Sequence, residues 1–520
     1  MSLLDAAALG RLQVEFRQSM RTLLMDLCLD IEGRYADLAE RLDLPVTYIR
    51  FLSQSFDRVS YSNWKVVGWI EALNDLVYFL DLLQQVRKAR DQRGFAEELF
   101  AECEQKFFEN SYLEELFPKD RAQAKGLATR LQWLCMRLAR EVTQESLFFD
   151  PRWAMQWKRR QGLSRWEIAG DLDQDFERAE RAFALSVGTA GDEFVAPKPV
   201  VKAIGQQTQR VVFEVTRHDI VLKSPRPVFI CTLEGAHVQW HWPRRAAVEA
   251  AATPLGPLTV GPTLRYGRDR QPRSVVATKP QQIARIARAW QAISRAWPQG
   301  HAILELLTSR IIPLKAAGVV SFSYRHRPGL SFINSFERDN LDLIDDLIHE
   351  NSHHHLNLLL RKHVLYHGDH NQQIFYSPWR RNLRPIRGIL HATFTFTMGV
   401  LLFERLSSWT ETKNGMKQWK KAGLTQRDLL RARFRCLEEI ESVRYSIQDL
   451  EYAGRHLKWL TGSGARLVRQ LEEAIAKAEQ QMVRHRKAVL ASTFGPVLQK
   501  HMTALHKARQ TYGPVSLHQA

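Results

Sequence analysis

The segment from Leu341 to Arg361, LDLIDDLIHENSHHHLNLLLR, constrains the fold more than any other part of the chain. Its apolar residues recur at the spacing of an amphipathic helix, and neither Pro nor Gly interrupts it. Asp339 or Asn340 is suited to cap its start. We therefore expect a helix here, with an apolar face packed into a core.

The centre of this helix carries His349-Glu350-Asn351-Ser352-His353. Residues four apart share a helical face, so His349 and His353 can hold one metal ion, with the Glu350 carboxylate one residue round the turn. The alternative is a polar, histidine-rich face of a surface helix. The mid-helix position behind an apolar stripe favours the metal site.

Two histidines do not complete such a site, because zinc and non-haem iron both take a third protein ligand. A metzincin would have Gly and His where this chain has Leu356 and Leu359, which excludes that class. A gluzincin could use Glu404, although no acidic motif surrounds it. His391 lies in an apolar segment that predicts a helix, where a buried imidazole needs a partner or a metal. We expect His391 to be the third ligand; the alternative is a core histidine with a polar partner.

An arginine-rich loop, YSPWRRNLRPIRG, runs from Tyr376 to Gly388 and precedes His391. Arginine binds carboxylates through two parallel hydrogen bonds. A loop of this kind between two metal-ligand helices suits an anionic co-substrate or a peptide carboxylate. Surface charge is an equally good explanation of the same arginines.

The composition limits which binding partners and which cellular compartment are expected. The net charge of +18 is spread along 520 residues, which favours a solvated basic surface over a nucleic-acid groove. No apolar run approaches the ~20 residues of a membrane helix, and the first residues lack a secretory pattern. The five cysteines are scattered and never form CxxC, as in reduced proteins. The sequence thus predicts a cytoplasmic protein that binds neither membrane nor nucleic acid.

The chain is predicted to be α+β and predominantly α-helical. The residues around Asp37 to Leu52 have the outline of a helix-turn-helix, but their apolar second helix favours packing over DNA contacts. Two further strands are expected between Ile311 and Phe336. The predicted regions are a helical N-terminal domain (1–150), a basic helical connector (151–199), a segment with short strands, a loop at 246–275 and a helix (200–300), a metal-binding core (301–410) and a helical C-terminal region (411–520).

Several spaced elements within Ala302 to Glu404 carry a resemblance: a PG pair, HENSH, SPWR, RP and GILH. Together they resemble the HExxH-motif peptide-modification proteins encoded with ribosomally made, post-translationally modified peptides. Some members of that family are iron- and α-ketoglutarate-dependent hydroxylases that act on a precursor peptide. The first 200 residues show no such match.

The resemblance implies Fe(II) at His349 and His353, with His391 as third ligand. It also implies that Arg380 or Arg384 binds the α-ketoglutarate carboxylate. Glu350 would then be structural or hold a ligand imidazole in orientation. The expected partner is a precursor peptide.

Three hypotheses follow. The first is the iron and α-ketoglutarate oxygenase. The second is a zinc metallopeptidase with Glu350 as catalytic general base. The third is a non-catalytic peptide- or nucleic-acid-binding helical protein whose histidines are incidental.

Overall fold

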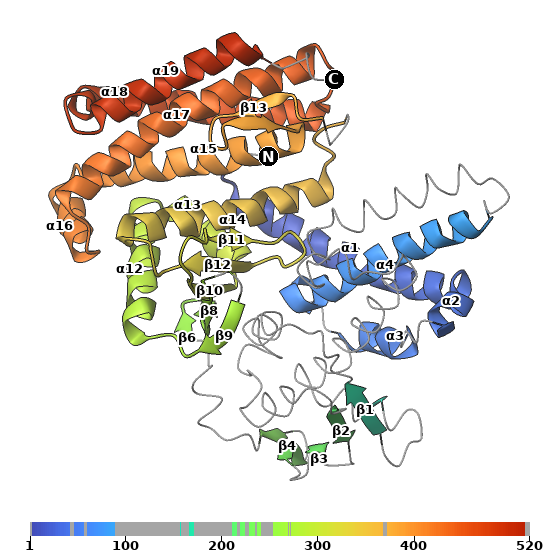
Figure 1. The fold of residues 1–520 in the computed structure, drawn as a ribbon. Helices are drawn as coiled ribbons and strands as arrows, with labels where there is room; N and C mark the ends of the chain where they lie inside the picture. The colour runs from blue at the N-terminus through green and yellow to red at the C-terminus, as the bar shows by residue number, and fades with distance from the viewer. Residues whose placement is uncertain are drawn as a thin grey trace.

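The fold of this protein is taken from a computed structural model. It describes residues 3–41, 46–56, 60–88, 156–157, 166–170, 211–215, 219–223, 228–234, 237–240, 253–268, 270, 272–367 and 372–514. The predicted class is confirmed, because these residues form a predominantly helical α+β structure (Figure 1).

Four helices form the described part of the N-terminal region: α1 (Ala6–Gly33), α2 (Ala36–Arg41), α3 (Val46–Ser55) and α4 (Trp64–Lys88). Asp5 caps α1 by accepting a hydrogen bond from the Ala8 backbone. The apolar side of α3 is buried, and Trp157 lies against Tyr48 and Phe51. The packing interpretation of this segment is therefore confirmed. The helix predicted for residues 89–150 lies outside the described residues.

A five-stranded antiparallel sheet follows, in the order β1-β2-β3-β4-β5. The strands predicted between residues 200 and 245 are confirmed. The helical prediction for the connector is wrong at β1, because that stretch pairs with β2 and so becomes a strand through a non-local contact. The rest of 158–199 lies outside the described residues. The strands are β1 (Trp166–Gly170), β2 (Val211–Val215), β3 (Asp219–Lys223), β4 (Val228–Glu234) and β5 (His237–Trp240).

A second, mixed sheet is organised around β10 (Arg310–Lys315), which pairs in parallel with three strands. The loop predicted for 246–275 is wrong in part, because four short strands lie within 253–276. The two strands expected between Ile311 and Phe336 are confirmed, although one has only two residues. The remaining strands are β6 (Thr253–Leu255), β7 (Leu258–Val260), β8 (Thr263–Tyr266), β9 (Pro272–Val276), β11 (Phe322–Ser323) and β12 (Leu330–Asn334).

Two helices separate these strands. The helix predicted at 281–297 is α12 (Pro280–Ala296), and α13 (Pro298–Leu307) starts directly after it. Both begin with Pro in the first turn, where its missing N–H costs nothing. The Pro-Gln-Gly sequence at 298–300 forms the first turn of α13.

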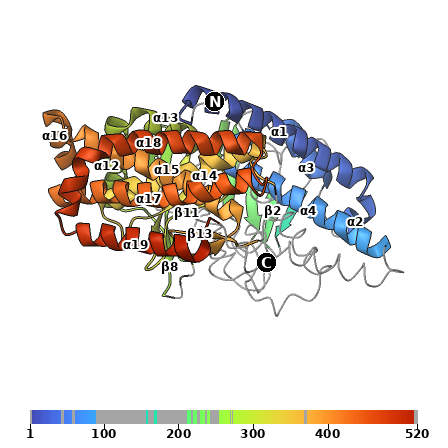
Figure 2. The same cartoon turned by 90° about the horizontal axis from the view of Figure 1, so that it is seen from above.

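The motif helix α14 (Asn340–Lys362) lies between the mixed sheet and α15 (Ile386–Trp409) (Figures 1 and 2). Beyond α15 come α16 (Lys413–Lys421), α17 (Gln426–Arg455), α18 (Gly462–Leu490) and α19 (Gly495–Tyr512). One apolar cluster runs from α1 through α14 and α15 to α18. A short β13–β14 hairpin (Phe375–Ser377 and Asn382–Arg384) carries the arginine-rich loop.

The helix α15 contacts α14, α17 and α18 and is the centre of this layer. It is long and apolar enough to cross a membrane, and 72% of its apolar window is buried inside the fold. Such burial is typical of a helix at the centre of a core.

Candidate metal centre

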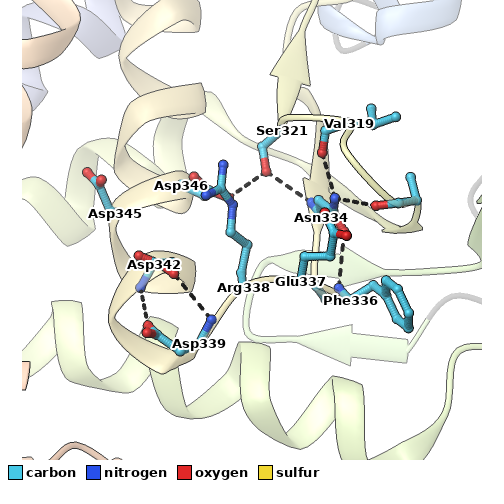
Figure 3. Close-up of polar contacts among 12 residues, drawn as sticks. Val319, Ser321, Asn334, Phe336, Glu337, Arg338, Asp339, Asp342, Asp345 and Asp346 are labelled. Carbon is cyan, nitrogen blue, oxygen red and sulfur yellow. Dashed lines mark hydrogen bonds and ion pairs between the residues drawn. The ribbon is translucent and has the colours of Figure 1, made fainter. Parts of the chain in front are cut away.

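The start of α14 is held against the mixed sheet by polar contacts (Figure 3). Asp339 caps the helix in a capping box with Asp342, as predicted for this position. Ser321 donates a hydrogen bond of 2.6 Å to the Asp346 carboxylate, and Arg338 pairs with the same carboxylate at 3.3 Å. These contacts fix the rotation of α14 and therefore the direction of every later side chain.

That rotation gives α14 two polar faces. The histidine face, defined by Asp345, His349 and His353, is turned toward α15 and α17. The sheet face, defined by Asp346, Glu350 and His354, is turned toward β11 and β12. Figure 3 shows Asp345 and Asp346 leaving the helix on different sides.

On the histidine face, the His353 ring lies near the rings of both His349 and His391, and the predicted trio of metal ligands stays a prediction. The ring centres of His349 and His353 are 5.0 Å apart, and those of His353 and His391 are 6.2 Å apart. All three side chains are partly exposed, so a ligand can reach them. His391 comes from the first turns of α15, more than thirty residues away in the chain.

The ring spacing tests whether one ion fits. Imidazoles bound at about 2.1 Å with a roughly tetrahedral angle place their ring centres about 5 Å apart. His349 and His353 meet this spacing, and His391 is roughly 1 Å too far. As the side chains stand, no group of three His, Cys, Asp or Glu residues in the described chain has metal-ligating geometry. The His391 ring would have to move for the three imidazoles to share one ion.

The charge state of these imidazoles suits metal binding, because only the neutral ring has a free lone pair. Burial lowers the pKa of His349, and the cation of Arg435 adds to this while Asp345 opposes it. Burial lowers the pKa of His353 well below its usual value, with the neighbouring rings of His349 and His391 contributing. Burial also lowers the pKa of His391 to about 4.

A layer of aromatic side chains covers His349. The Phe396 ring lies 5.2 Å from the His349 ring, edge to face, and Trp379 stacks on Phe396 at 4.3 Å. Trp379 donates a hydrogen bond of 2.7 Å to Glu439. Arg435 then joins Glu439 to Asp345, which lies one turn before His349. The arrangement holds the His349 side of the trio in a rigid, largely apolar surrounding.

The arginines divide between the two ends of the trio. The Arg380 guanidinium is close enough to lower the pKa of His349, and it forms no ion pair with another described residue. Arg384 instead lies against Gly388 at the start of α15. At the other end, Arg387 and Arg325 both lower the pKa of His391. Sequence analysis missed Arg325, whose only signal was the basic RHR stretch before Pro328.

Glu350 lies on the sheet face and is 2% exposed. One carboxylate oxygen, Oε2, has no hydrogen-bond partner among the described residues, and neither does the nearby Ser323 hydroxyl. Burial raises the pKa of Glu350 to about 8; proximity to Ser323 opposes this rise, while Asp346 and Asp345 reinforce it. A protonated carboxyl directed toward β11 is poorly suited to act on a ligand at His349.

The other histidines of the motif helix have structural partners. His354 receives the Gly329 backbone N–H at 3.4 Å and lies 3.1 Å from the Ser331 hydroxyl. The His355 ring packs edge to face on Phe394. Their placement away from His349 and His353 agrees with the prediction that they lie on other faces of the helix.

Glu404 is not part of this site. It accepts a hydrogen bond from Ser408 at 2.9 Å and pairs with Arg405 at 3.3 Å. It also lies thirteen residues after His391 on the same helix, which is about 20 Å along the axis. The gluzincin arrangement therefore lacks its acidic ligand here.

Comparison with known proteins adds no relative to this description. No protein-family model matches the chain, and no curated protein matches it significantly. The resemblance to the HExxH peptide-modification proteins therefore stays a prediction from sequence motifs.

Proposed function

We propose that this chain is a metal-dependent enzyme that modifies a ribosomally made peptide, with Fe(II) and α-ketoglutarate as cofactors. The observation that supports the proposal is the position of the partly exposed His353 ring near the rings of His349 and His391, beside an arginine without an ion-pair partner in the described chain. The assignment of a peptide substrate and of α-ketoglutarate rests on the sequence motifs.

His349 and His353 have the ring spacing expected of two imidazoles that share one metal ion. His349, His353 and His391 would hold the iron, which with the keto acid supplies oxidising chemistry when bound. Binding by all three requires the His391 ring to lie closer to the His353 ring than its 6.2 Å in this structure. The pKa shifts keep all three rings unprotonated at neutral pH without help from a metal.

The residues around the imidazoles have separate tasks. Arg380 is placed to bind a carboxylate beside His349, because its guanidinium fork is free within the described chain. Phe396 and Trp379 exclude water from the same side. Arg325 and Arg387 make the His391 side cationic, which favours an approach by an acidic peptide segment.

The placement of Glu350 favours this proposal over a zinc metallopeptidase. A peptidase needs a carboxylate that reaches the water bound by the metal. Glu350 is buried on the sheet face, and the histidines face α15. A role in holding α14 against β11 agrees better with this position.

Metal analysis of the purified chain is the first test. We expect about one iron per chain and, when O2 and a peptide substrate are present, conversion of α-ketoglutarate to succinate and CO2. Glu350→Gln should keep part of this activity. Zinc as the only metal, with complete loss of peptide cleavage in Glu350→Gln, would instead support the peptidase. Absence of metal from the purified chain, with function unchanged in His349→Ala, would leave the non-catalytic hypothesis.

The role of Arg380 has a matched control on the same hairpin. Arg380→Ala should raise the KM for α-ketoglutarate by about tenfold or more, the value of a lost charge-assisted hydrogen bond. Arg384→Ala should leave this KM within about twofold. Equal effects of the two substitutions would show that net charge, and not a specific contact, binds the keto acid.

A further inference from the structure

A second cavity lies on the other side of α14 from the histidines. It has a volume of about 220 Å³, opens to solvent and is lined by residues of α1, the end of α13, the loop before β12 and the last turns of α14. Its lining includes Arg17, Arg325, Arg361, Glu305 and Asn357. The proposed function uses none of these except Arg325, which also borders the His391 end of the trio.

The guanidinium of Arg361 is fixed in place at one wall of this cavity. It pairs with Glu71, donates a hydrogen bond of 2.9 Å to the Arg325 carbonyl and lies 4.7 Å above the Phe16 ring. Its side chain is only 11% exposed. A cation held this firmly in a buried position is prepared for a ligand without further ordering cost.

Donors on the other walls are free within the described chain. Arg17 uses Nε to donate to the Ser62 hydroxyl at 2.9 Å, and its terminal nitrogens form no hydrogen bond with another described residue. The Arg325 guanidinium and the Asn357 amide also form no hydrogen bond with another described residue. The cavity therefore offers N–H groups from three directions.

The charges around the cavity do not balance. Three guanidinium groups face it or border it, and two carboxylates, Glu305 and the Glu71 partner of Arg361, oppose them. One positive charge is left over. An excess of one positive charge is best matched by one monovalent anion, whereas a doubly charged phosphate would meet repulsion from Glu305.

The volume limits the size of that anion. The cavity holds roughly seven water molecules at about 30 Å³ each. A glutamate side chain or a small aromatic acid fits this space, and a nucleotide does not. Arginine forks match the planar geometry of a carboxylate.

We propose that this cavity is a second binding site, which takes a single carboxylate group. The group belongs either to a small free acid or to an acidic residue of a peptide, and both sources share the same recognition chemistry. The site does not depend on a metal, so its failure and the failure of the proposed function are distinguishable.

Calorimetric titration of the full chain without added metal tests the proposal. The probes are benzoate, the peptide acetyl-Ala-Glu-Ala-amide and its Gln counterpart. We expect one-to-one binding of benzoate, of the Glu peptide or of both, and no binding of the Gln peptide. Binding of benzoate alone identifies a small-acid site, and binding of the Glu peptide alone identifies a peptide site.

Four substitutions locate the binding. Arg17→Gln should weaken it by about tenfold or more, and Glu305→Gln should strengthen it several-fold. Arg11→Gln, an exposed arginine on the same helix outside the cavity, should leave it unchanged. Binding should also survive Arg380→Ala, which separates this cavity from the keto-acid site.

Three results would overturn the proposal. These are the absence of binding by either carboxylate probe, equal affinity in Arg17→Gln and Arg11→Gln, and loss of binding in Arg380→Ala. Melting temperatures of the variants show whether each is folded, and the Glu305→Gln gain cannot arise from unfolding.

Discussion

The two faces of α14 carry similar residue types in different surroundings. The histidine face has partly exposed imidazoles beside an aromatic layer and an arginine with no ion-pair partner in the described chain. On the sheet face, Asp346 and His354 are hydrogen-bonded to serines and to the Gly329 backbone N–H, and Glu350 is buried against β11. One helix therefore separates the groups available to a ligand from the groups that hold the helix in place.

This comparison changes how the HExxH pattern is interpreted here. Its two histidines and its glutamate are adjacent in sequence, yet they are directed to opposite sides of the helix. Burial against β11 makes Glu350 part of the support, and accessibility makes His349 and His353 candidates for chemistry. Substitutions on the two faces should therefore affect different properties.

The largest effect is expected on the histidine face. His353→Ala should weaken metal binding by more than about a hundredfold, because it removes a ligand and not merely its support. The free energy of unfolding of the metal-free chain should change by less than about 1 kcal/mol, since the ring is partly exposed. Metal analysis and urea denaturation measure the two quantities. Unchanged metal content in this variant would contradict the assignment of His353 as a metal ligand.

The matching substitution on the sheet face is His354→Ala. It removes a buried ring and leaves the Gly329 N–H and the Ser331 hydroxyl without this partner, at a cost of about 2–4 kcal/mol. The metal content of the folded variant should stay at the wild-type level. A loss of metal without a loss of stability would show that His354 acts with the histidine face and not with the sheet face.

A carboxyl group on the sheet face should give a pH-dependent effect on stability. Burial raises the pKa of Asp346 from 3.8 to about 6, with Ser321 and Arg338 opposing the rise. Because the folded pKa exceeds the unfolded one, this carboxyl destabilises the fold progressively as pH rises from about 4 to about 6. Asp346→Asn should gain up to about 2 kcal/mol relative to wild type over that window. Urea denaturation at pH 4 and pH 7 measures the difference, and an equal effect at both values would contradict it.

The smallest effect concerns both faces together. Asp339→Ala removes the N-terminal cap of α14 and should cost about 1 kcal/mol. Neither face changes its surroundings, so metal content should be unaffected. Thermal unfolding measures the loss, and Glu337→Ala, outside the capping box, is the control.

The helices were predictable because their apolar spacing is a local property of the sequence. The capped helix at Asn340, the pair α17 and α18 and the helix around His391 all follow from such patterns. The loop between α17 and α18 ends just before Gly462, and the Gly-Ser-Gly stretch forms the first turn of α18. The strands β6 to β9 were missed because segments of three to five residues rich in Pro and Gly become strands only by pairing with one another and with β10.

The site was predictable to the same extent. Two histidines four residues apart on a helix must share a face, so His349 and His353 required no tertiary information. The approach of His391 depends on how α15 crosses α14, which a motif can suggest but not measure. The division of the arginines depends on the hairpin geometry, which places Arg380 near His349 and Arg384 against Gly388. Arg325 approaches His391 from the mixed sheet, and no local sequence pattern predicts this proximity.

X-ray absorption spectroscopy of the iron-loaded chain tests the central claim most directly, because it counts the imidazoles on the metal. The account predicts one ion per chain with the scattering of three imidazoles, falling to two in His391→Ala. A spectrum that is identical in wild type and His391→Ala, or a chain that retains no stoichiometric metal, would contradict it.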